Sequence, residues 1–142
     1  MKKFDSSVRR QLRSASKFYA IDPALAYQVG IAQESKDTFH FENMVLIELL
    51  RHGSKVYYWQ SNEAEIDFVV ETQERERHLI QVAWSLEDLK TLARELHAFD
   101  AFKKAFPKLK IHRKLIITVE PFLQSQLSNQ IETIPFVLWA SG

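Results

Sequence analysis

Three polar side chains lie where the pattern of apolar residues predicts a hydrophobe, and their types could support metal-dependent chemistry. Glu42 shares the inward face of a predicted helix with Val45 and Leu46, while Asp67 and Gln81 lie in the middle of two predicted strands. A carboxylate is rarely buried unless it is paired, hydrogen-bonded or bound to a metal. If the helix covers both strands, the three side chains converge, and their oxygens are ligands that Mg²⁺ accepts. The alternative is that Glu42 acts as a cap or pairs with a basic residue, while Asp67 and Gln81 form hydrogen bonds within the sheet.

The elements that would position these side chains follow from the periodicity of the apolar residues. Residues 38–52 repeat apolar positions at three- and four-residue steps and precede Gly53, which predicts a helix. Residues 55–60 and 65–70 predict a hairpin, and residues 79–84 a third strand. Strand alternation places Ile66, Phe68 and Val70 on one side of the second strand. In the third strand it places Leu79, Gln81 and Ala83 on one face.

The rest of the chain predicts one α/β domain with helices packed on a mixed sheet. A second long helix is expected over residues 86–106 with Ser85 as its N-cap, followed by a buried strand at 114–119. A helical turn at 122–127 and a closing strand at 136–139 complete this core of residues 37–142. Residues 1–36 are expected to form a basic arm and a short helix that packs on the core. The residues expected to be largely buried are Phe41, Val45, Leu49, Phe68, Val70, Ile80, Val82, Leu92, Leu96, Ile116 and Trp139.

Composition excludes several classes of protein. The chain has 142 residues, 46% of them hydrophobic, and no cysteine, which fits a single domain and rules out a thiol nucleophile or a Cys-built metal site. Three glycines are too few for a P-loop or a dinucleotide-binding fingerprint, so no nucleotide cofactor is expected. No stretch resembles a signal peptide or a membrane span, and we expect a cytoplasmic location. The net charge of +1 excludes a general polycation. Residues 1–17 are nevertheless basic, and their expected nucleic-acid contacts are Arg9, Arg10, Arg13 and Lys17.

Several short motifs, taken in order, resemble a known superfamily. Phe41-Glu42-Asn43, then Glu65-Ile-Asp-Phe68, then Ile80-Gln-Val82 before a long helix resemble the PD-(D/E)XK nuclease-like superfamily. The segments Ser7-Val-Arg-Arg-Gln11, Lys17-Phe-Tyr-Ala-Ile-Asp22 and Tyr57-Tyr-Trp59, with Thr91 and Arg94-Glu95, resemble more narrowly the uncharacterised C-terminal domain of bacterial and archaeal AAA-type ATPases.

The resemblance implies a restriction-endonuclease-like core in the order α-β-β-β-α-β. It also implies catalytic positions at Glu42, Asp67 and Gln81, and weak binding of Mg²⁺ or Mn²⁺ by Glu42, Asp67 and Glu65. The third strand departs from the superfamily's pattern, because Gln81 replaces an acid and Ala83 occupies the position of the motif lysine.

Three functions remain open after these observations. The favoured one is a module of nuclease fold that has lost catalysis and serves nucleic-acid binding or regulation, with DNA or an ATPase domain outside this chain as partner. The second is an active Mg²⁺-dependent DNA or RNA endonuclease whose missing lysine is replaced by Lys55, Lys90 or Arg94. The third is a structural or dimerising domain, and an oligomer fits any of the three. No membrane partner is expected.

Overall fold

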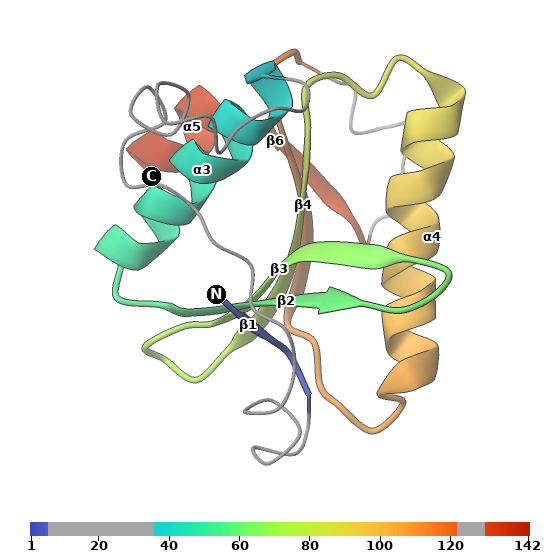
Figure 1. Ribbon diagram of the computed structural model, residues 1–142. Coiled ribbons are helices and arrows are strands. Elements are labelled where there is room, and N and C mark those ends of the chain that lie inside the picture. Colours follow the sequence, from blue (N-terminus) through green and yellow to red (C-terminus); the bar gives the residue numbers. More distant parts are fainter. Residues whose placement is uncertain (6–35, 122–129) are drawn as a thin grey trace.

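The structure, a computed structural model, describes residues 1–5, 36–121 and 130–142 and confirms the mixed α/β fold. One six-stranded sheet has the strand order β1-β2-β3-β4-β5-β6 (Figure 1). β3 is antiparallel to both β2 and β4, and the other neighbouring pairs are parallel. The described elements are β1 (Lys2–Lys3), α3 (Lys36–Arg51), β2 (Lys55–Gln60), β3 (Glu65–Glu71), β4 (Arg77–Ala83), α4 (Leu89–Ala105), β5 (Arg113–Thr118), β6 (Glu132–Pro135) and α5 (Phe136–Ser141).

Helices cover both faces of the sheet, so the core has two apolar layers (Figure 1). On one face α4 contributes Phe99 and Phe102 to a buried cluster that also contains Ile66. On the other face α3 contributes Phe41, Val45 and Leu49 to a second cluster. The other buried members of this cluster are Leu46, Phe68, Val70, Ile80, Val82, Leu115 and Ile117. Eight of the residues expected to be buried are confirmed, whereas Leu92, Leu96 and Trp139 are only partly buried. None of the helices in the described ranges is long and apolar enough to cross a membrane.

The hairpin of β2 and β3 contains an irregularity that the alternation pattern does not predict. Tyr57 pairs with Val69, but Trp59 pairs with Ile66, so the register shifts by one residue between them. As a result Ile66 lies in the cluster under α4, while Phe68 and Val70 lie in the cluster under α3. The prediction that these three β3 residues share one face is therefore wrong for Ile66. Leu79 and Ala83 do share a face of β4, as expected.

Both ends of the chain also differ from the prediction. The expected strand at 136–139 is wrong, because β6 ends at Pro135 and residues 136–141 form α5. Proline lacks the N–H that would continue the ladder, and it favours the start of a helix. At the other end Lys2 and Lys3 pair with β2 at the sheet edge, and Phe4 is 3% exposed. The helix expected before Gly30 and the turn expected at 122–127 lie outside the described residues.

The second long helix begins later than expected, and its N-cap differs. Asp88, rather than Ser85, caps α4, because its carboxylate accepts a hydrogen bond from the backbone N–H of Lys90 at 3.1 Å. Ser85 instead accepts from the backbone N–H of Glu87 at 3.2 Å, one turn before the helix starts. The helix therefore runs from Leu89, and its middle turns face the start of β3.

Candidate functional site

A cavity of about 480 Å³ lies beside the start of β3 and contains the side chains that the sequence singled out. Glu42 reaches it from α3, Glu65 and Asp67 from β3, and Gln81 from β4. The hairpin turn that joins β2 to β3 forms another wall, and α4 closes the side with Arg94, Glu95 and Ala98. The structure thus brings together all four residues that were expected to form a catalytic or metal site.

Toward the cavity, the backbone pairing between β3 and β4 ends at Phe68 and Ile80. Beyond this pair, hydrogen bonds from side chains connect the two strands. The backbone N–H of Asp67 donates to Gln81 Oε1 at 2.8 Å, and Gln81 Nε2 donates to the carbonyl of Glu65 at 2.9 Å. Asp67 Oδ2 accepts from the backbone N–H of Val82 at 2.9 Å. Asp67 and Gln81 therefore form hydrogen bonds within the sheet, as the alternative interpretation of these residues predicts.

Glu95 is a further carboxylate of this cavity, and the sequence analysis missed its part in the site. Its side chain is buried, with 5% of the residue exposed, and Oε1 accepts from Arg94 Nη2 at 3.1 Å. Burial raises the pKa of Glu95, the neighbouring Arg94 opposes the rise, and the charges of Glu42 and Glu65 add to it. The signal was present in the sequence, because Glu95 lies on the apolar stripe of α4 just as Glu42 lies on that of α3.

The cavity is strongly acidic. Among the described residues, five acids line it, namely Glu42, Glu63, Glu65, Asp67 and Glu95. One described basic residue, Arg94, lines it as well. Yet within the described ranges, no group of three or more His, Cys, Asp or Glu is arranged so that it could hold a metal ion. One oxygen of Asp67 is also engaged by Val82. The weak binding of Mg²⁺ or Mn²⁺ expected at Glu42, Asp67 and Glu65 stays a prediction.

The position of the motif lysine lies in the apolar core rather than in the cavity. Ala83 is 5% exposed and belongs to the cluster under α4. Of the three residues considered as replacements for the lysine, only Arg94 lines the cavity. Lys55 lies in a separate hollow beside the β3–β4 turn, and Lys90 is exposed at the start of α4. The expected nucleic-acid contacts Arg9, Arg10, Arg13 and Lys17 lie outside the described residues.

Comparison with known proteins gives one family and one relative. A family model described as "Domain of unknown function (DUF4143)" matches residues 37–139. An uncharacterized protein of Haemophilus influenzae (strain ATCC 51907 / DSM 11121 / KW20 / Rd) is 27% identical over 139 residues, which are 97% of this chain and 32% of the relative. The chain thus spans about a third of the length of the curated relative it matches. No solved structure gives a significant match.

Proposed function

The chain belongs to the DUF4143 family, and from that membership and the geometry of the acidic cavity we propose that it is a non-catalytic module with a restriction-endonuclease-like core. In this proposal the module serves nucleic-acid binding or regulation alongside an AAA-type ATPase.

One observation carries the loss of catalysis: the motif side chains are used to join the strands. Both polar atoms of the Gln81 amide form hydrogen bonds with the backbone of β3, and one carboxylate oxygen of Asp67 accepts a hydrogen bond from the backbone of β4. Cleaving a phosphodiester needs a group that activates water and a positive charge that stabilises the transition state. Ala83 supplies neither, and its burial leaves no room for solvent at that position. This arrangement supports a structural role for the former motif.

The ATPase in the proposal rests on the sequence resemblance and on the length of the relative. The relative is about three times as long as the matched segment, so it has room for another domain of ordinary size. The motifs of this chain resemble a domain that follows an AAA-type ATPase. The proposed partner is therefore an ATPase domain. Regulation by the module would be measured as a change in the rate at which that partner hydrolyses ATP.

Incubation of the chain with supercoiled plasmid and either Mg²⁺ or Mn²⁺ tests the loss of catalysis. We expect no nicking above the level of a metal-free control. The matched variant is Asp67→Asn, because an amide oxygen can still accept from Val82 while the negative charge is lost. Nicking by the unmodified chain that Asp67→Asn abolishes would overturn the proposal.

The active nuclease is the second candidate, and a single observation favours it. The Arg94 guanidinium lines the cavity and could supply positive charge where the motif lysine is missing. Its side chain is 75% exposed and is held by Glu95. If this candidate is right, the same plasmid assay gives nicking that Arg94→Ala removes and that Lys90→Ala, a change at an exposed lysine of the same helix outside the cavity, leaves intact.

A further inference from the structure

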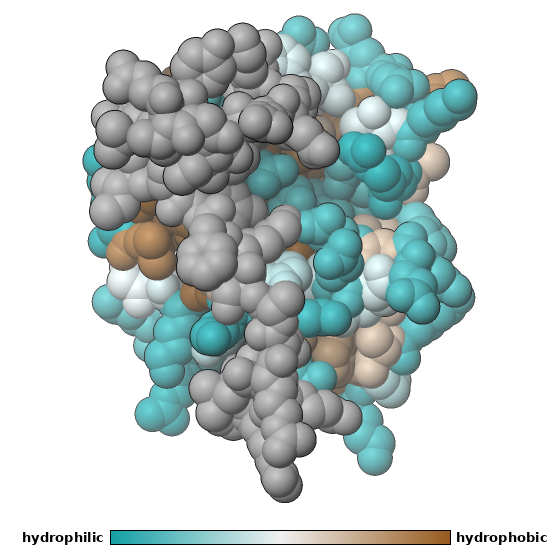
Figure 2. Space-filling model, viewed as in Figure 1, coloured by the Kyte–Doolittle hydropathy of each residue, from teal (hydrophilic) through white to brown (hydrophobic). Residues whose placement is uncertain are grey.

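The strongest concentration of positive charge among the described residues lies far along the chain from the basic N-terminus. Residues 103–114, which lead from the last turn of α4 into β5, hold six basic residues and no acidic one. We refer to them as the α4–β5 segment. Figure 2 shows mainly hydrophilic residues on the side of the molecule where α4 lies in Figure 1. The lysines of the segment are Lys103, Lys104, Lys108, Lys110 and Lys114.

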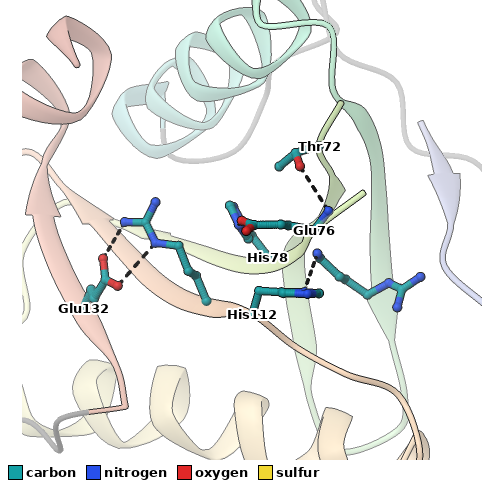
Figure 3. Close-up of polar contacts among 7 residues, drawn as sticks. Thr72, Glu76, His78, His112 and Glu132 are labelled. Atoms are coloured by element: carbon teal, nitrogen blue, oxygen red, sulfur yellow. Dashed lines mark hydrogen bonds and ion pairs between the residues drawn. The ribbon is translucent and has the colours of Figure 1, made fainter. Parts of the chain in front are cut away.

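These lysines are not neutralised by neighbours. None of the five forms an ion pair with another described residue. The sixth base, Arg113, differs: its Nη2 lies 2.5 Å from Glu132 Oε2 and its Nε 3.3 Å from Glu132 Oε1. In Figure 3 dashed lines mark the two contacts of the labelled Glu132. Nearby Glu76 is engaged by His78, at 3.0 Å. Glu132 and Glu76 are thus engaged by Arg113 and His78, and Asp100 lies one turn before Lys103 and Lys104 on α4 without forming an ion pair with either of them.

Helix capping explains only part of this charge. Lys103 and Lys104 lie in the last turn of α4, where cations stabilise the negative end of the helix dipole. Lys108 and Lys110 lie beyond the helix and are exposed, and Lys114 is already in β5. The dipole falls off within one turn, so it gives no reason for these three.

A cavity of about 460 Å³ opens beside the segment and has an aromatic floor. Phe99, Phe102 and Phe106 line it, and Lys103 and Lys114 stand at the same cavity. Phe106 lines the cavity and is only partly buried, and its ring also packs on those of Phe4 and Phe102. Ligands with a planar ring and a phosphate suit such a site, because stacking on the aromatic ring and attraction to the lysines act together.

We propose that the α4–β5 segment and this cavity bind single-stranded nucleic acid, with phosphates on the lysines and a base stacked at Phe106. The inference rests on the proposed function and assigns its nucleic-acid binding to this part of the molecule. A duplex keeps its bases stacked inside, so it would use the lysines but not the aromatic floor. The site also lies at the end of the sheet where β4 begins, whereas the acidic cavity lies toward the end of β4. Phosphates bound here avoid the five acids of the acidic cavity, and the carboxylate that lines this cavity, Glu132, is paired with Arg113.

Fluorescence anisotropy of a labelled 20-nucleotide single strand with the full chain tests the site. We expect the logarithm of the affinity to fall with the logarithm of salt concentration, with a slope of about −3.5 if five lysines each contact a phosphate. Replacing Lys108→Glu and Lys110→Glu together should weaken binding about tenfold or more at low salt. The matched control is Lys55→Glu with Lys90→Glu, which makes the same charge change at two exposed lysines outside the segment and should have a much smaller effect.

Further ligands distinguish the contribution of base stacking from that of phosphate contacts. An abasic strand of equal length should bind about tenfold more weakly, because each stacked base contributes to affinity. Equal binding of the abasic strand or of a duplex would overturn the single-strand assignment. Binding to phosphatidylserine vesicles without binding to the strand would overturn it in favour of a membrane surface. Unchanged affinity in the variant with Lys108→Glu and Lys110→Glu would overturn the site but not the proposed function. The proposed function would be overturned by a different result, metal-dependent cleavage of plasmid by the unmodified chain.

Discussion

Gln81 joins two strands at a point where no backbone pair does so. Its amide serves the N–H of Asp67 and the carbonyl of Glu65, and the residue is 2% exposed. Gln81→Ala removes the hydrogen bonds from Gln81 to both buried backbone groups, and we expect the free energy of unfolding to fall by about 2–4 kcal/mol. Urea denaturation measures this change.

Thr118 on the neighbouring strand β5 provides the control for Gln81. Its side chain is fully buried, and its hydroxyl has no hydrogen-bond partner. Thr118→Val removes a polar group that gains nothing from burial, so stability should change by less than about 1 kcal/mol or increase. A loss from Gln81→Ala no larger than this would contradict the bridging role of Gln81.

Glu95 should give the stability of the protein a pH dependence. Burial raises its pKa above the ordinary value of 4.5, so the folded chain binds this proton more tightly than the unfolded chain. The free energy of unfolding therefore falls as the pH rises from 4.5 through the raised value, and is then constant. Glu95→Gln removes that contribution. Urea denaturation across this pH range should show the variant gaining stability relative to the parent as pH rises, and a difference independent of pH would contradict the assignment.

At the scale of elements, α3 is held to the sheet by a narrow apolar stripe. Leu49 is 5% exposed and packs in the cluster with Phe68 and Ile80, whereas its neighbour Leu50 is 56% exposed. Leu49→Ala should lower the free energy of unfolding by about 2–5 kcal/mol, because it leaves a cavity in the core. Leu50→Ala should change it by less than about 0.5 kcal/mol. Thermal or urea unfolding of both variants checks the difference, and equal losses would show that α3 packs through another face.

The same elements show which features a local pattern can predict. The periodicity of α3, α4 and the first hairpin predicts their type and bounds within a few residues, and polar interruptions of that periodicity point to Glu42, Asp67 and Gln81. The bulge that moves Ile66 to the other face depends on the register in which Trp59 pairs with Ile66, which the alternation of apolar residues along a single strand does not reveal. The last apolar run, 136–139, is short enough to suit a strand or a helix, and Pro135 decides in favour of α5.

At the scale of the whole molecule, charge of opposite sign collects at the two ends of the sheet. The acidic cavity holds Glu42, Glu65 and Glu95, and the α4–β5 segment at the other end carries five lysines that form no ion pair with a described residue. A net charge of +1 conceals this separation. A polyanion approaching the protein is therefore attracted at one end and repelled at the other, which orients it before contact.

The basic N-terminal arm is the second source of positive charge, and its contribution needs a test that spares the fold. Deleting residues 1–17 would also delete β1 and Phe4, which packs on Phe102 and Phe106. Loss of binding after such a deletion would therefore report loss of structure. The substitutions Arg9→Gln, Arg10→Gln and Arg13→Gln remove three charges and keep β1 and Phe4.

If each of these arginines contacts a phosphate, their joint replacement should weaken binding of a 20-nucleotide single strand at low salt. It should also lower the slope of log affinity against log salt by about 2, because each phosphate contact on a single strand contributes about 0.7 to that slope. Circular dichroism should show an unchanged melting transition. The slope could instead stay unchanged in this variant while the variant with Lys108→Glu and Lys110→Glu still binds weakly. That result would assign the phosphate contacts to the α4–β5 segment and would contradict a role of the three arginines in binding.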